Sequence, residues 1–149
     1  MPVLAVNRKA AFDYEILETF EAGIELLGFE VKSVRAGRMS LIGAFALIRK
    51  NEAFLTNALI PPYQAANAPP RYDPSRSRRL LLHAAEIKKL IGLTAQRGLT
   101  LLPLRIYTKG SRIKVELGLA RRKKKYDKRE RIREREDLRK IERAMKSNL

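Results

Sequence analysis

The sequence predicts a mainly β fold with helices, arranged as an antiparallel β-barrel that is followed by a basic C-terminal tail. Short segments with apolar residues at every second position are separated by turns rich in glycine and proline, a pattern typical of half-buried strands. One segment in the second half has helical spacing instead. At Arg121 the composition changes to nearly continuous charge, so we expect residues 1–120 to form one domain and residues 121–149 a tail.

The first strand is predicted over Ala11 to Phe20, where apolar and polar residues alternate. Leu17 and Glu18 interrupt this alternation. Gly23 follows closely, and an isolated glycine in a strand pattern often marks a bend or a bulge. We therefore expect the chain to bend near Gly23, as small barrels require at their corners.

A short helix is predicted next, over residues 29–38. Two apolar strands, 44–49 and 53–59, then flank a turn at residues 50–52, which indicates a hairpin. The stretch 61–77 contains five prolines and no apolar period, so it is expected to be a long loop and a candidate contact surface.

The most strongly predicted helix covers residues 83–98, which follow three consecutive leucines. Two strands, 99–108 and 113–119, then bracket a glycine turn at residues 109–111. About six short strands with one or two helices favour an OB-type barrel, a fold that often binds oligonucleotides. A split β-sandwich would produce a similar pattern.

The charge of the chain points to a polyanionic partner. Among 149 residues, 32 Lys and Arg face 16 Asp and Glu, which gives a net charge of +16. Residues 1–120 and residues 121–149 each carry +8, so the tail holds half the charge in a fifth of the length. RNA or DNA is the expected partner, because cationic proteins gain affinity for nucleic acids by releasing counterions.

Basic residues of the first 120 positions fall into three groups: Arg8 and Lys9; Lys32, Arg35 and Arg38; and Arg71, Arg76, Arg78 and Arg79. A solvated surface is the usual explanation of such runs. Together with the basic tail, an RNA-binding surface is the better interpretation here, because arginine grips phosphate through two parallel hydrogen bonds.

Several classes of protein are disfavoured. The chain has no cysteine, which excludes disulfides and thiolate metal sites, and His83 is the only histidine. No phosphate-binding glycine loop or metal-ligand cluster is present, so we expect no cofactor, no metal and no catalytic residue. No apolar run approaches the roughly 20 residues of a membrane span, and no signal peptide is evident, so we expect no membrane contact and a cytoplasmic location.

The tail can form a helix but is expected to be disordered in the free protein. Oppositely charged pairs four residues apart favour a helix; they are Asp127 with Arg131, Glu136 with Lys140, and Glu142 with Lys146. Four arginines at the same spacing repel one another, namely Arg131, Arg135, Arg139 and Arg143. Such a helix is marginal alone, so we expect it to fold on a polyanion. Asp127 and Glu130 have the spacing of a capping box at its start.

Two residues of the predicted barrel have a plain and a functional interpretation. Glu21 is more simply a surface carboxylate than an acceptor for the amino groups of RNA bases, although both fit its place beside Gly23. His83 is more simply a residue at the start of a helix than a ligand.

Five motifs in register resemble small protein B, the bacterial tmRNA-binding family. They are Asn7-Arg-Lys-Ala, Phe20-Glu-Ala-Gly-Ile, Gly28-Phe-Glu-Val-Lys-Ser-Val-Arg-Ala-Gly, Asp73-Pro-Ser-Arg-Ser-Arg-Arg-Leu-Leu-Leu-His and Tyr126-Asp-Lys-Arg-Glu. The resemblance implies an OB-like barrel that binds the tRNA-like part of transfer-messenger RNA and delivers it to ribosomes stalled on messages without a stop codon, the process of trans-translation. It also implies one monomer per tmRNA.

The resemblance assigns roles by position and reverses the plain interpretations of Glu21 and His83. Matched to tmRNA binding are Asn7, Tyr14, Glu21, Leu81, His83, Lys123 and Lys124. Matched to the ribosomal decoding centre and the mRNA channel are Asp127, Lys128, Arg129, Arg143 and Met145. The chain departs from the family pattern at Ser40, Arg79 and Arg122, where asparagine, lysine and glycine are usual. The alternative is an OB-type ribosomal or initiation-factor-like protein that binds rRNA directly, and a metal-dependent nuclease is a third class.

Overall fold

The computed structural model describes residues 2–64, 66, 68–123, 133, 135–143 and 145. The elements up to residue 123 are, in chain order, β1 (Val3–Val6), α1 (Arg8–Asp13), β2 (Tyr14–Ile24), α2 (Gly28–Arg35), β3 (Phe45–Arg49), β4 (Glu52–Thr56), β5 (Arg78–Leu81), α3 (Ala84–Thr94), β6 (Leu99–Lys109) and β7 (Arg112–Arg122).

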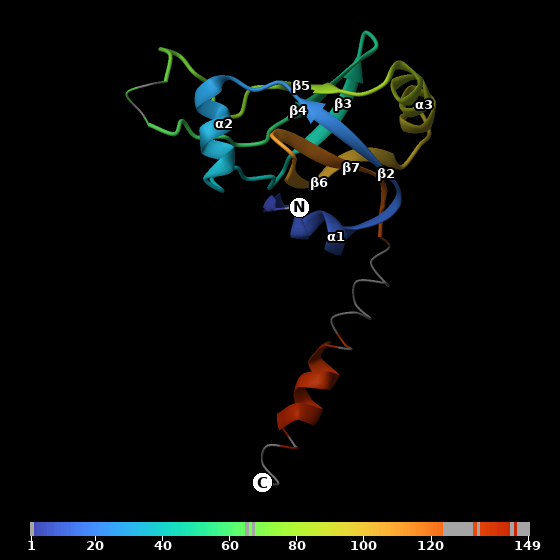
Figure 1. The fold of residues 1–149 in the computed structure, drawn as a ribbon. Helices are drawn as coiled ribbons and strands as arrows, with labels where there is room; N and C mark the ends of the chain where they lie inside the picture. Colours follow the sequence, from blue (N-terminus) through green and yellow to red (C-terminus); the bar gives the residue numbers. More distant parts are fainter. Residues whose placement is uncertain are drawn as a thin grey trace.

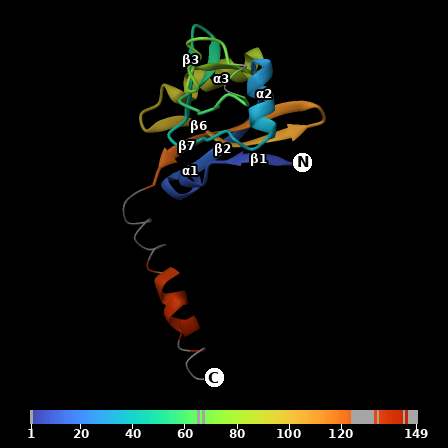
Figure 2. The same ribbon diagram turned by 90° about the vertical axis from the view of Figure 1, so that its left-hand side faces the viewer.

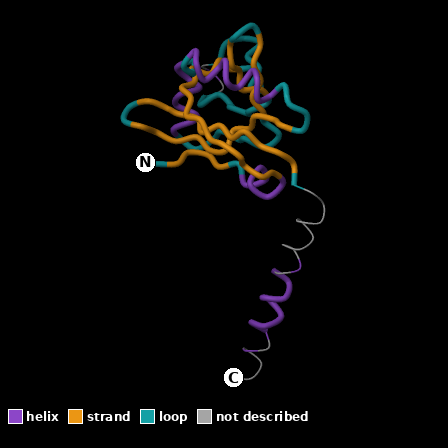
Figure 3. Tube along the Cα trace, turned by 90° about the vertical axis from the view of Figure 1, so that its right-hand side faces the viewer, coloured by secondary structure: helices purple, strands orange, loops and turns teal. Residues whose placement is uncertain are grey.

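The strands close into an antiparallel barrel. Strand β6 pairs with β3, and the order then runs through β4, β5 and β2 to β7, which pairs with β6 and completes the ring. Strand β1 adds to the edge of β6 outside this ring. Helices α2 and α3 lie on opposite sides of the strands (Figure 1), and the strands occupy the middle of the body (Figure 3). The predicted OB-like antiparallel barrel is therefore confirmed.

One main hydrophobic core fills the barrel. Leu55, Leu101 and Leu117, from β4, β6 and β7, are almost completely buried in it. Val34 of α2 and Leu90 of α3 belong to the same cluster and are fully buried. Each helix thus attaches to the barrel through an apolar residue, which positions its polar surface beside the strands.

The prediction of a strand over Ala11 to Phe20 is wrong at its start. Residues 8–13 form α1, because the Asn7 side chain accepts a hydrogen bond from the Ala10 amide at 3.1 Å and caps the helix. Helix α1 lies against β2 and β6 (Figure 2). Strand β2 includes Gly23 without a break in its pairing, and the irregularity in that pairing lies between Ile16 and Glu18, where the alternation is broken.

The other predicted elements are present with shifted ends. The hairpin between β3 and β4 turns at Lys50 and Asn51, whose φ angles of 49° and 62° are those of a type I′ turn. Helix α2 is shorter than the predicted 29–38, and α3 is shorter than 83–98. Strands β6 and β7 both extend beyond the predicted ends, and neither β1 nor β5 was predicted.

The described part of the tail is helical. Residues 135–143 form a helix whose side chains are exposed, including Leu138 and Ile141. The predicted capping box at Asp127 and Glu130 lies outside the described residues. That the tail is disordered when free stays a prediction.

Candidate nucleic-acid interface

Glu21 lies on the outer face of β2 and is held by two neighbours from β6. The Tyr107 hydroxyl donates a hydrogen bond to Glu21 Oε2, and Lys109 Nζ lies 3.2 Å from Oε1. These two hydrogen bonds, that of Tyr107 first, lower the pKa of Glu21 below its ordinary value. Burial and the bond to Glu21 in turn raise the pKa of Tyr107 to about 12. Glu21 is therefore an oriented, ionised carboxylate at neutral pH.

Leu81 ends β5 directly beside Gly23 of β2. A Cβ atom at Gly23 would lie 3.3 Å from the Leu81 Cβ, so a larger residue there would press on Leu81. Although leucine is apolar, 48% of Leu81 is exposed. The result is an apolar surface two residues along the sheet from the Glu21 carboxylate, suited to packing against the face of a base.

His83 precedes α3 and is exposed. Its main-chain N–H donates a hydrogen bond of 3.2 Å to Glu86 Oε1, which fixes the start of the helix. The His83 side chain is accessible where it lines the groove, so it can contact a partner there.

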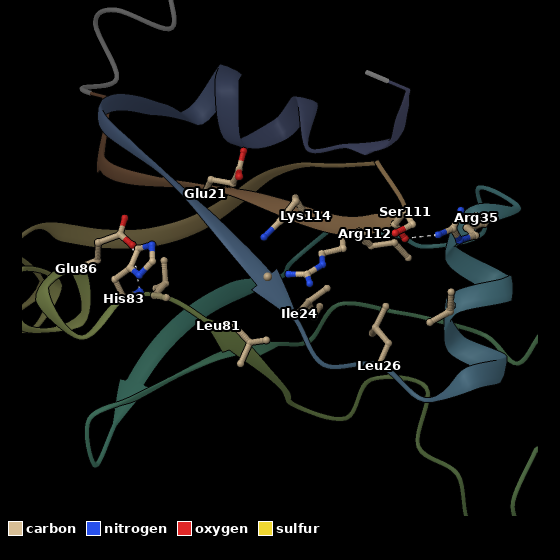
Figure 4. Close-up of a pocket in the computed structure, with 14 residues that line it drawn as sticks. Glu21, Ile24, Leu26, Arg35, Leu81, His83, Glu86, Ser111, Arg112 and Lys114 are labelled. Carbon is tan, nitrogen blue, oxygen red and sulfur yellow. Dashed lines mark hydrogen bonds between the residues drawn. The ribbon is translucent and has the colours of Figure 1, made fainter. Parts of the chain in front are cut away.

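These residues share one groove of about 600 Å³. In Figure 4, His83 and Glu86 lie at one end, Arg35 lies at the other beside Ser111, and Arg112 and Lys114 lie between them. Arg35 donates a hydrogen bond of 2.7 Å to the Ser111 carbonyl, which ties α2 to the turn between β6 and β7. The groove thus combines an ionised carboxylate, an apolar surface and three cations, a set that can contact base edges, base faces and phosphates.

Sequence reasoning missed Tyr107, Lys109, Arg112 and Lys114. A signal for them was present, since polar residues occupy every second position on one face of both strands: Arg105, Tyr107 and Lys109 on β6, and Arg112, Lys114 and Glu116 on β7. The register pairs Tyr107 with Lys114 and Lys109 with Arg112, so the two rows lie side by side.

Two other predicted RNA-binding residues lie away from this groove. Asn7 is only 9% exposed, and its Nδ2 donates a hydrogen bond of 2.9 Å to the Pro103 carbonyl in addition to capping α1. Tyr14 begins β2 and packs beside the small cluster that contains Ala10. Both line a second groove of about 340 Å³, together with Lys9 and Arg122. The structure therefore does not bring Asn7 and Tyr14 together with Glu21.

Lys123 attaches the end of β7 to α1. Its main-chain N–H donates to the Asp13 carbonyl at 2.9 Å, and its Nζ donates to the Ala11 carbonyl at 3.1 Å. A cation at the C-terminal end of a helix is favourable because the exposed carbonyls carry partial negative charge.

The remaining predicted residues belong to the tail. Lys124, Asp127, Lys128 and Arg129 lie outside the described residues. Arg143 and Met145 are helical and exposed, and 67% of Met145 is accessible.

The part of the chain that the structure describes contains neither a metal-ligand cluster nor a membrane-spanning helix. No group of three or more His, Cys, Asp or Glu residues there could hold a metal ion. No helix there is both long enough and apolar enough to span a membrane.

Comparisons with known proteins agree over almost the whole chain. The family model for SmpB protein matches residues 4–147. The SsrA-binding proteins of Thermosynechococcus vestitus and Synechococcus elongatus are 55% and 57% identical over 144 residues, which cover 97% of this chain and 95% and 94% of theirs. A solved structure described as "tmRNA-SmpB: a journey to the center of the bacterial ribosome" matches with a TM-score of 0.68 and 51% identity, covering 84% of this chain and 87% of that one. The chain belongs to the SmpB protein family.

Proposed function

We propose that this protein is a non-enzymatic adaptor that binds the tRNA-like part of tmRNA and delivers it to stalled ribosomes in trans-translation. The observation that carries the proposal is the groove in which Glu21, Leu81 and His83 lie together beside Arg35, Arg112 and Lys114. The relatives described as SsrA-binding proteins and the tmRNA-SmpB ribosome structure support it. The cytoplasm, where ribosomes work, is the location that follows.

The groove offers two kinds of contact to RNA: specific contacts with bases and non-specific contacts with phosphates. Glu21 uses part of its acceptor capacity for Tyr107 and Lys109, and its free lone pairs can accept hydrogen bonds from base amino groups. Leu81 provides an apolar surface for a base, and the cations attract phosphates. Because few contacts reach bases, recognition depends mainly on RNA shape, which suits a partner folded like a tRNA.

We infer a division of labour between two parts of the chain. The barrel, residues 1–120, binds one tmRNA as a monomer, and the tail, residues 121–149, probes the empty decoding centre and the mRNA channel. The tail residues in this role are Asp127, Lys128, Arg129, Arg143 and Met145. Lys124 contacts tmRNA, and Lys123 acts at the junction, where its bonds to α1 hold the root of the tail.

The groove is tested by comparing Glu21→Ala with Glu18→Ala. Both glutamates lie on β2, but Glu18 faces Lys89 of α3 at 2.6 Å and lies outside the groove. In a gel-shift titration we expect Glu21→Ala to weaken tmRNA binding about tenfold or more, equivalent to about 1.4 kcal/mol. Glu18→Ala should stay within about twofold. Equal effects of the two changes would remove Glu21 from the RNA-binding surface.

The division of labour is tested by truncation after Lys123, which keeps β7 complete because this strand pairs with β2 up to Arg122. We expect the truncated protein to lose rescue of stalled ribosomes and to keep its tmRNA affinity within about tenfold. A loss of several hundredfold would show that the tail carries the affinity. Recovery of rRNA alone with the full-length protein from cells would instead support the rRNA-binding alternative.

A further inference from the structure

Four exposed cations run along α2 and the proline-rich loop, next to the proposed tmRNA groove. We call this surface the α2–loop ridge; its members are Lys32, Arg35, Arg38 and Arg71. None of the four forms an ion pair with a carboxylate in the described part of the chain. The sole acidic residue between Leu26 and Asn51 is Glu30, which is fully buried. Asp73, the one acidic residue of the loop 61–77, accepts a hydrogen bond from the Ser75 amide at 2.9 Å and forms no ion pair with these four cations in the described part of the chain, so the ridge keeps an excess of positive charge.

Arg71 occupies a backbone position that favours glycine. It is the third residue of a turn in which the Tyr72 amide donates to the Pro69 carbonyl at 3.1 Å, and its φ is 67°. A proline in second place with positive φ in third place is the geometry of a type II turn. An arginine there is strained, and its exposed side chain makes no hydrogen bond or ion pair within the described residues. Folding does not account for an arginine at this position.

Arg38 is held in place at the other end of the ridge. Its guanidinium lies 5.2 Å from the centre of the Tyr63 ring, and its Nη1 donates to the Tyr63 carbonyl at 2.9 Å. The Tyr63 ring remains 39% exposed. Because a guanidinium has five N–H donors, Arg38 keeps donors for a phosphate while its orientation is already set.

The loop that carries Arg71 is itself anchored to α2. Tyr72 packs edge-on against Phe29 with ring centroids 4.7 Å apart, and its hydroxyl lies 2.8 Å from Glu30 Oε2. Arg78 binds the same carboxylate oxygen and the Pro74 carbonyl. The backbone that carries Arg71 is thus fixed against α2, which lowers the entropy lost on binding.

The ridge is continuous with the groove through Arg35, which belongs to both. Lys32 and Arg35 lie in the last turn of α2, where positive charge stabilises the end of a helix, so their presence has a structural explanation. That explanation does not apply to Arg71, which lies on the separate loop. We propose that the α2–loop ridge binds the phosphate backbone of tmRNA where the RNA continues beyond the groove. This inference rests on the proposed function and adds Lys32, Arg38 and Arg71 to the tmRNA-binding surface.

The decisive variant is Arg71→Gly, because glycine relieves the positive-φ strain while it removes the cation. We expect a thermal midpoint that is unchanged or higher, a tmRNA affinity that is about three- to tenfold lower, and a shallower salt dependence, with the slope of log K against log salt reduced by about one. The triple change Lys32→Ala, Arg38→Ala, Arg71→Gly should lower affinity at least about thirtyfold at fixed salt. The matched control, Arg49→Ala, Lys88→Ala, Arg97→Ala, removes three exposed cations elsewhere and should stay within about threefold.

Each outcome bears on the ridge separately from the groove. Equal losses in the ridge and control triples would mean that only net charge matters and would overturn the inference. If Glu21→Ala weakens tmRNA binding and the ridge triple variant does not, the inference about the ridge is wrong and the proposed function stands. If neither changes tmRNA affinity, both fail. Retained tmRNA affinity with lost binding to ribosomes would assign the ridge to ribosomal RNA and would also overturn the inference.

Discussion

The buried carboxylate of Glu30 offers the sharpest test of how this fold is stabilised. The side chains of Glu30 and Arg78 are both fully buried, and Arg78 Nε and Nη2 lie 3.0 and 2.6 Å from Glu30 Oε2. Arg76 and the Leu27 amide bind the other oxygen. Burial alone would raise the pKa of Glu30, but the hydrogen bonds from Arg76, Leu27 and Arg78 together lower it from 4.5 to about 2.

Replacing Glu30 with glutamine keeps the shape and removes the negative charge. The fall in pKa corresponds to about 3 kcal/mol of preference for the charged form. Removal of one member of a buried ion pair typically costs about 3–5 kcal/mol, because the partner charge is left unpaired. We therefore expect Glu30→Gln to lower the free energy of unfolding by about 3–5 kcal/mol at pH 7, a large share of the stability of a typical domain.

The assay is urea unfolding of the wild type and of Glu30→Gln between pH 7 and pH 2.5. Because the folded pKa lies below the unfolded value, the contribution of Glu30 is complete above about pH 4.5 and disappears as the pH falls towards 2. The stability difference between the two proteins should shrink over that interval. Glu15→Gln, at an exposed position of β2, should change stability by less than about 0.5 kcal/mol. A difference below 0.5 kcal/mol for Glu30→Gln, or one independent of pH, would refute this reasoning.

Three further changes test local features. Asn7→Ala removes both the cap of α1 and the bond to a distant carbonyl, so we expect a loss of about 1–3 kcal/mol in urea unfolding, and a loss below 0.5 kcal/mol would contradict the structural role. Asn51→Gly, at a φ of 62°, should raise the thermal midpoint slightly, and a decrease would argue against the type I′ turn. Tyr107→Phe and Lys109→Met should each raise the pKa of Glu21, measured by NMR titration, because the first removes a hydrogen bond and the second removes a hydrogen bond and a positive charge that lower it; an unchanged pKa in either variant would contradict this.

Local sequence patterns predicted the long strands and the helix, each of which packs against the core through one apolar face of its own. Strand β7 alternates between polar and apolar residues from Arg112 to Leu117, and Asn51 and Gly110 tolerate the positive φ of the two hairpin turns, so neighbouring residues were sufficient to find these segments. Helix α1 was missed because its cap depends on more than local sequence. Asn7 is held by the Pro103 carbonyl, 96 positions away, and that bond exists only after β6 is in place.

For the candidate site too, the sequence identified some residues, and only the tertiary structure showed which others lie beside them. The resemblance identified Glu21, Leu81 and His83, but the pairing of β2 with β5 and β7 decided that they share a groove with Arg112 and Lys114. The partners of Glu21 could not be predicted individually, because Tyr107 and Lys109 reach it from a strand that does not pair with β2.

By itself, the sequence determined a mainly β class with helices, the excess of positive charge and its concentration in the tail, since these depend on composition and on short-range periodicity; the strand pairing decided for a closed barrel over a split β-sandwich. Composition and periodicity could not distinguish Glu21 from Glu30, two carboxylates in a basic chain, and only the family resemblance singled out Glu21. Only the tertiary structure decided that Glu21 is exposed to a partner and that Glu30 is buried against Arg78. The physical reason is that burial and hydrogen bonding depend on which distant segments meet, here α2 with residues 72–78, and no local pattern encodes that meeting.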